Sequence, residues 1–166
     1  MDMKKYDDVF LNYLNEYEQT IMKTLCSDKQ IVSLLTGVEN PKIPNKSLMY
    51  KQVFPFNYVP DTSQEAKTFI TFYIEVPSAY NSTLKNYYLY IGITTHESLM
   101  RTGSGKVTTL LATAVDNLLN GRMDIMGIGT LELVSSTTST PVESYHTRHL
   151  TYSVKDWNKV NSIVKR

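Results

Sequence analysis

Hydrophobic residues recur at helical spacing in the middle of the chain. Between Gly105 and Gly121, apolar side chains at positions 107, 110, 111, 114 and 118 fall on one stripe of an α-helix. Gly121 suits the left-handed conformation that often ends a helix. The spacing predicts an amphipathic helix that lies on a sheet, with Thr108, Thr109 and Asp116 on its solvent side.

Two further helices are predicted nearer the N-terminus. Residues 4–25 repeat apolar side chains at spacings of three and four. Ser27 with Gln30 has the spacing of a capping box, so a short helix follows and ends at Gly37. From 38 to 64 the periodicity disappears, and four prolines interrupt any helix or ladder. Two interpretations stay open for this long irregular loop: it wraps the sheet with its aromatic side chains, or it reaches a neighbouring subunit.

Four strands are predicted around the central helix. Residues 67–76 and 86–95 are rich in β-branched and aromatic residues and indicate a hairpin with a polar connector at 78–85. Residues 128–135 and 147–155 predict a second pair, with Leu131 and Leu133 pointing inward and the polar residues 135–141 as a hairpin tip. The order α-α-β-β-α-β-β is typical of an α+β fold: a four-stranded, mainly antiparallel sheet with helices packed on one face.

Length and composition narrow the possibilities. At 166 residues we expect one domain, made of helices (1–37), loop (38–66), ββαββ core (67–158) and tail (159–166). A net charge of +1 argues against a general nucleic-acid binder. Cys26 is the only cysteine and falls on the apolar side of a helical pattern, as a small buried hydrophobe would. Without a secretory leader or an apolar run of membrane length, we expect a location in a reducing cytoplasm.

Candidate chemistry is sparse. The GSGK sequence at 103–106 opens a helix but lacks the spacing of a phosphate-binding loop and the Ser or Thr that follows its lysine. His146 and His149 are three apart on a predicted strand, so they point to opposite faces and cannot bind one metal ion together. The residues leave a Ser/His/Asp arrangement open but give no positive sign of one. We predict a non-enzymatic protein with no catalytic, cofactor-binding or metal site.

Several sequence phrases resemble the tail-terminator, or tail-to-head joining, proteins of long-tailed bacteriophages and prophages. They are YVPD at 58–61, EAKTFI at 65–70, HESLMR at 96–101, DNLLNG at 116–121, GIGTLEL at 127–133 and LTYSVKDWN at 150–158. The resemblance implies a structural virion protein that forms a ring, generally a hexamer, on the head-proximal end of the tail tube. Such a ring stops tube polymerisation and docks to the head-completion, or stopper, protein of the capsid connector. DNA passes through its lumen without specific recognition.

The resemblance also implies a location and a set of contacts. We expect a protein of the virion tail or neck, assembled in the bacterial host cytoplasm, with no cofactor and no membrane partner. The candidate contacts to neighbouring subunits or to the tube are Phe56, Tyr58, Asp61, Tyr80, Met100, Arg101 and Glu143. The alternatives are a head-completion protein or other neck or tail component, a monomeric α+β module that binds a partner or small ligand, and an enzyme.

Overall fold

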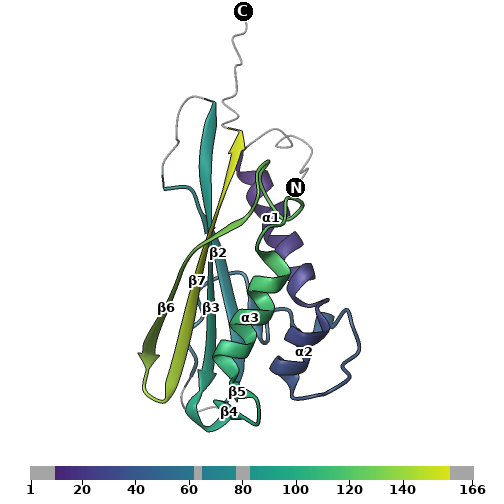
Figure 1. Cartoon of the computed structure of the whole chain (residues 1–166), viewed down its shortest axis with the longest axis vertical. Coiled ribbons are helices and arrows are strands. Elements are labelled where there is room, and N and C mark those ends of the chain that lie inside the picture. The colour runs from purple at the N-terminus through teal and green to yellow at the C-terminus, as the bar shows by residue number, and fades with distance from the viewer. Residues whose placement is uncertain (1–9, 62–64, 78–82, 158–166) are drawn as a thin grey trace, which may run out of the picture.

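Three α-helices and a mixed sheet make up the part of the chain that the structure describes (Figure 1). In this computed structural model the described residues are 10–61, 65–77 and 83–157. The helices are α1 (Phe10–Leu25), α2 (Lys29–Thr36) and α3 (Val107–Leu119). None of the helices described is both long enough and apolar enough to cross a membrane.

The main sheet has five strands in the order β1-β2-β3-β7-β6. Their bounds are β1 Val53–Phe54, β2 Thr68–Glu75, β3 Leu84–His96, β7 Tyr145–Trp157 and β6 Glu132–Val142. Neighbouring strands are antiparallel, except that β1 runs parallel to β2. A separate small hairpin of β4 (Arg101–Thr102) and β5 (Gly105–Lys106) lies between β3 and α3. The predicted α+β class is confirmed, and β1, β4 and β5 are additional short strands.

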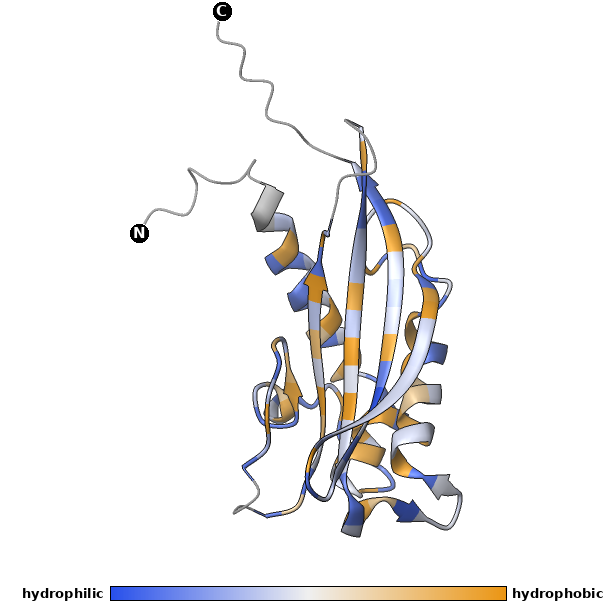
Figure 2. Ribbon diagram, turned by 90° about the vertical axis from the view of Figure 1, so that its left-hand side faces the viewer, coloured by the Kyte–Doolittle hydropathy of each residue, from blue (hydrophilic) through white to orange (hydrophobic). Residues whose placement is uncertain are grey.

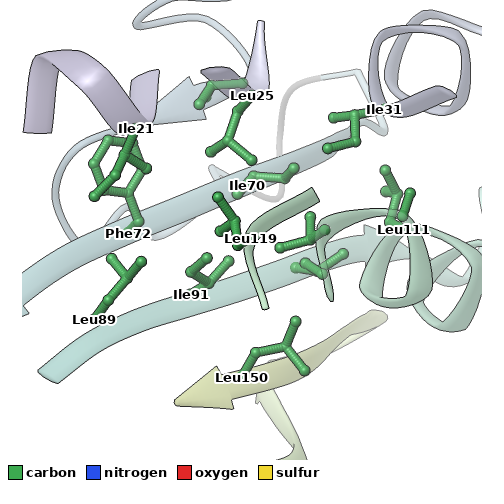
Figure 3. Close-up of a cluster of buried hydrophobic side chains, with 14 of the residues drawn as sticks. Ile21, Leu25, Ile31, Ile70, Phe72, Leu89, Ile91, Leu111, Leu119 and Leu150 are labelled. Atoms are coloured by element: carbon green, nitrogen blue, oxygen red, sulfur yellow. The ribbon is translucent and has the colours of Figure 1, made fainter. Parts of the chain in front are cut away.

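The core lies between the helices and one face of the sheet. Alternate residues of the long strands point toward the helices, and Figure 2 shows the resulting bands of hydrophobic and hydrophilic residues along the strands. Buried side chains from both layers meet there, among them Ile21, Leu25, Ile31, Ile70, Phe72, Leu89, Ile91, Leu111, Leu119 and Leu150 (Figure 3). Removing this apolar area from water is the main force that holds the layers together.

The buried stripe of α3 is rotated from the predicted one. Leu111 and Leu119 are fully buried, whereas Leu110 and Leu118 are half-buried. Thr108, predicted on the solvent side, is buried as well. The cause is local, because the chain just before the helix covers its first turn: the Val107 N–H donates to the Met100 carbonyl over 2.9 Å, and the Thr108 hydroxyl contacts the Met100 sulfur at 3.6 Å.

The start of α2 also differs from its prediction. Asp28, and not Ser27, is the N-cap, and its Oδ1 accepts a hydrogen bond from the Ile31 N–H over 2.8 Å. A carboxylate at this position also favours the positive end of the helix dipole. Gly37 ends the helix in the left-handed conformation, as predicted. Cys26 between α1 and α2 is buried, and burial raises the pKa of its thiol to about 11, which confirms the interpretation as a buried hydrophobe.

The prediction of a hairpin tip at residues 135–141 is wrong, because these residues belong to β6. The stretch is polar but rich in β-branched threonine, and the ladder with β7 holds it extended without burial of its side chains. The turn follows later, at Ser144, whose φ is +64°. Leu131 is buried as expected, whereas Leu133, which was predicted to point inward as well, is 37% exposed.

Three other predicted segments extend beyond the described residues. They are the first turns of the N-terminal helix (4–9), most of the polar connector (78–82) and the tail (158–166). The long segment 38–64 is described up to residue 61. Part of it wraps the sheet, which is the first of the two interpretations given above. Val53 and Phe54 add a short strand beside Ile70 and Thr71.

Two tyrosine–carboxylate hydrogen bonds join the helices to β7. The Tyr17 hydroxyl on α1 donates to Asp156 Oδ2 over 3.0 Å, and the Tyr152 hydroxyl on β7 donates to Asp116 Oδ1 of α3 over 3.0 Å. Burial, and then the charge of Asp156, raises the pKa of Tyr17 to about 12. Both phenols therefore stay protonated, and act as donors, across the neutral pH range.

Gly127 makes a close approach that no other residue type allows. Its φ is +68°, and a Cβ there would lie 2.6 Å from the Lys155 carbonyl oxygen. Gly121 has a φ of +83° but open space around it. We expect Gly121→Ala to cost about 1 kcal/mol through backbone strain alone, and Gly127→Ala to cost at least about 1 kcal/mol more. Urea denaturation of both variants checks this difference, and equal losses would contradict the close packing of residue 127 on β7.

The raised pKa of Tyr17 makes stability depend on alkaline pH. Because the phenol of Tyr17 keeps its proton more tightly in the folded chain than at its ordinary pKa near 10, its contribution is complete below pH 10 and declines toward pH 12. We expect Tyr17→Phe to lower the stability at neutral pH but to flatten its decline between pH 10 and 12. Urea midpoints measured at several pH values check this, and parallel profiles for the two proteins would contradict it.

Candidate functional site

The loops at one end of the sheet are tied to one another, at the lower end of Figure 1. The 3-10 helix η3 (Glu97–Leu99) follows β3, and the β4–β5 hairpin comes next. The Glu97 N–H donates to the Ser144 carbonyl over 2.8 Å, which joins η3 to the β6–β7 turn. Segments that are nearly 50 residues apart in sequence therefore form one continuous surface.

Aromatic side chains cover the opposite, helix-free face of the sheet near this end. Phe54 and Tyr58 stack with ring centroids 4.3 Å apart, and Tyr58 meets Phe69 edge-on at 5.1 Å. Phe69 continues to Tyr145, with their centroids 6.3 Å apart. Phe54, Phe69 and Tyr145 are buried, so this aromatic cluster is a second small core that fixes the chain between β1 and β2. The Lys67 ammonium lies 4.4 Å from the centroid of the Tyr58 ring and donates to its hydroxyl over 2.8 Å.

A polar groove opens on the helix side, between the start of α3 and the β6–β7 hairpin. Its volume is about 380 Å³, and its walls are Met100, Lys106, Thr108, Thr109, Thr138, Ser139, Thr140, His146, Thr147 and Arg148. Arg148 Nη1 donates to the Ser136 hydroxyl over 3.1 Å, while its buried Nε has no hydrogen-bond partner among the described residues. Two cations and several hydroxyl groups suit the recognition of a carboxylate or another polar acceptor on a partner.

Two of the three histidines contact serines. His149 Nε2 and the Ser139 hydroxyl are 2.7 Å apart, and His96 Nδ1 and the Ser98 hydroxyl are also 2.7 Å apart. Burial lowers the pKa of His149, which favours its neutral form. A nucleophilic serine needs a histidine that a carboxylate orients in turn, and within the described ranges neither imidazole has such a contact. The same residues contain no group of three or more potential metal ligands from His, Cys, Asp and Glu.

The structure brings most of the predicted contact residues to this end of the molecule. Met100 lines the groove, and Arg101 and Glu143 are exposed on the β4–β5 hairpin and on the β6–β7 turn. Phe56 is 46% exposed with its ring 5.6 Å from that of Phe54, and Tyr58 is half-buried in the aromatic cluster. The remaining two are Asp61, which is exposed, and Tyr80, which lies outside the described residues. Their role as contacts stays a prediction.

Sequence reasoning missed three features of this surface. Arg148 and Lys106 lie far apart in the sequence, yet the β7 register and the start of α3 place both on one groove. Most of β6 was missed, because the predicted strand 128–135 overlaps only its first residues and the rest has no apolar alternation; the threonines of that part were the available signal. Lys67 also contacts three aromatic rings, a cation–π arrangement that only the fold reveals.

Lys67 should stabilise the aromatic cluster through its charge. We expect Lys67→Met to reduce the free energy of unfolding by about 1 kcal/mol, because the variant keeps an apolar chain but loses the cation and the donor to Tyr58. Lys67→Arg, which retains the cation, should lose less. Urea denaturation compares the three proteins, and a Met variant as stable as the wild type would show that the cation is not part of the cluster's stability.

Comparisons with known proteins identify a family and a fold. A search of curated protein sequences gave no match. Among solved structures, a chain from the virion of a native gene transfer agent particle aligns with a TM-score of 0.55 and 14% identity, over 84% of this chain and 93% of its own length. A second solved chain aligns over 64% of this chain and 79% of its own at 14% identity, but its TM-score of 0.38 is too low to support an argument. The family model YomW matches residues 19–154, and the chain therefore belongs to the YomW family.

Proposed function

We propose that this protein is a structural component of a phage or phage-derived particle, and that it acts as a tail terminator. The observation that carries the proposal is the fold, which is shared over 93% of the length of a chain in a gene transfer agent virion. The sequence phrases that resemble tail terminators add the specific role. In that role the protein forms a ring, generally a hexamer, that caps the head-proximal end of the tail tube and joins it to the stopper protein of the head connector.

The exposed end of the molecule supports contacts with such partners. Arg101 and Glu143 project from two loops that hydrogen bonds hold in place, so their positions are fixed without a partner. Phe56 adds an exposed apolar ring beside the aromatic cluster. Protruding loops on a rigid sheet are suited to binding, and a ring of identical subunits needs two different surfaces that meet head to tail.

Charge is compatible with a DNA channel. The formal net charge of the chain is +1, from 17 basic and 16 acidic residues. A strongly basic lumen would bind the phosphate backbone and slow the passage of DNA, whereas a near-neutral one would not. In this proposal DNA is a passing cargo, and no base is recognised.

A partner-binding module is the second candidate, and the groove beside α3 favours it. Its lysine, arginine and hydroxyl groups are arranged to hold one polar segment of another protein. Such a module would act as a monomer. A stopper or another neck protein would form an assembly that differs from the ring of a tail terminator. The oligomeric state therefore separates the first candidate from the second.

Native mass spectrometry over a range of concentrations, with negative-stain electron microscopy, tests the ring. We expect a closed ring, most simply of six copies, and we expect Arg101→Ala combined with Glu143→Ala to abolish it because both side chains lie at the proposed contacts. Lys29→Ala combined with Glu39→Ala removes an equal pair of exposed charges from α2 and the loop that follows, and serves as the matched control. Rings that persist unchanged in the Arg101/Glu143 variant would contradict this contact, and a monomer at every concentration would favour the binding module.

A further inference from the structure

The two outer edges of the main sheet are unequal. On one side β6 runs for 11 residues beside β7, and among the described residues no strand pairs with its other edge, although the Leu133 N–H donates to Asn120 Oδ1 over 3.3 Å. On the opposite side β1 covers β2 only at Ile70 and Thr71. The part of β2 from Phe72 to Glu75 has an outer edge with no strand beside it among the described residues. Figure 1 shows β6 at one side of the molecule and helices α1 and α2 at the other.

The central part of β6 lacks the features that usually protect an edge strand. Ten of its 11 residues are exposed, and from Leu133 to Val142 it carries no charged side chain. Natural edges are commonly blocked by inward-pointing charges, lysines, prolines or bulges. Here Pro141 and one bulge lie at the lower end and another bulge lies at Val134, so the stretch between them remains regular. An edge of this kind is a template for another strand.

We propose that β6 pairs with the outer edge of β2 in a second copy of this chain, so that the sheets of neighbouring subunits join. The inference rests on the proposed ring, because it supplies the contact between ring subunits. Strand direction supports it. β2, β3, β7 and β6 alternate in direction, so β6 is antiparallel to β2. If the ring axis is parallel to the strands, rotation about it leaves the strand directions unchanged. β6 of one copy is then antiparallel to β2 of the next copy, as neighbouring long strands are within one sheet.

The side chains at the two edges also match. Register places Ile74, Leu89, Tyr152 and Leu133 in one row on the helix-bearing face. Leu133 is 37% exposed at one end of this row, and Ile74 is half-buried at the other. Joining the copies along this row brings the two aliphatic side chains together and removes both from water. In this register the free part of β2 faces residues 132–135 of β6, across the bulge at Val134, and Glu75 lies opposite Glu132, so the joint must hold against one pair of like charges.

Charged side chains lie on the helix-bearing side of both edges. Lys106 and Arg148 line the groove beside β6. Helix α1 packs over β1 and β2 and carries Glu16, Glu18 and Lys23, of which Glu16 and Lys23 are exposed. Pairing of the edges would bring the two glutamates of one copy to the side of the joint where the basic groove of the next copy lies. A second copy related by a two-fold axis would instead place β6 against β6 and bring the basic grooves together.

Engineered cysteines test the joint directly in the full-length protein. In one copy Leu133 and Ile74 are three strand spacings apart, about 14 Å, too far for an internal disulfide. Cys26 is buried and does not compete. Under a mild oxidant, we expect Leu133→Cys combined with Ile74→Cys to give a ladder of covalent multimers up to the size of the ring. Each single variant should give none.

The possible outcomes separate this inference from the ring itself. Rings without cross-links in the double variant would overturn the edge pairing and leave the ring proposal standing. Dimers from Leu133→Cys alone would overturn it in favour of β6–β6 pairing. Cross-linked ladders without a closed ring would support the edge pairing and count against the tail-terminator role.

A charge variant tests the same joint without cysteines. We expect Ser135→Lys on β6 to raise the concentration needed for assembly at least tenfold, because it places a charge on the pairing edge. Asn117→Lys adds the same charge to the exposed face of α3 and should leave assembly unchanged. Assembly of Ser135→Lys at the wild-type concentration, in a protein of unchanged stability, would overturn the proposal.

Discussion

The pairing of β3 with β7 is the interaction on which the rest of the structure depends. Its register runs without interruption from Leu84 opposite Trp157 to His96 opposite Tyr145. Because side chains alternate across a strand, this single register decides which residues face the helices and which face away. Leu89, Ile91 and Leu150 enter the main core, while Thr94 and Thr147 meet on the other face through a 2.7 Å hydrogen bond between their hydroxyls.

The helix-free face is held by close contacts between small side chains and by the aromatic cluster. Gly92 on β3 lies against Thr71 of β2, so closely that a Cβ would approach the threonine hydroxyl to 2.7 Å. Beyond this row the chain from β1 folds over the sheet and buries Phe54 on Phe69. One face of the sheet therefore carries helices and the other carries a thin polar and aromatic layer, and both leave β6 uncovered.

Patterns of burial could be predicted from the sequence, and features that depend on packing could not. Alternating apolar residues located β2 and β3, and the apolar stripe located α3. Burial of one face of a strand or helix makes apolar residues recur at a fixed interval along the sequence. The segment from Ser135 to Pro141 has no such period, and hydrogen bonds to β7 decide its conformation. The cap at Asp28 was missed by one residue, since two adjacent residues could both cap and the fold selects one. Met100, Arg101 and Glu143 lie at the same end of the sheet because of the register between strands that are distant in the sequence. No local sequence pattern could predict that proximity.

The long ladder between β3 and β7 also has a mechanical consequence. Antiparallel hydrogen bonds lie perpendicular to their strands, so tension along the strands loads all of them in shear. The bonds must then break together and not one after another. A subunit with this ladder along its longest dimension resists stretching in that direction far better than peeling from the side. The orientation of the sheet relative to an applied load would therefore decide how much force each subunit withstands.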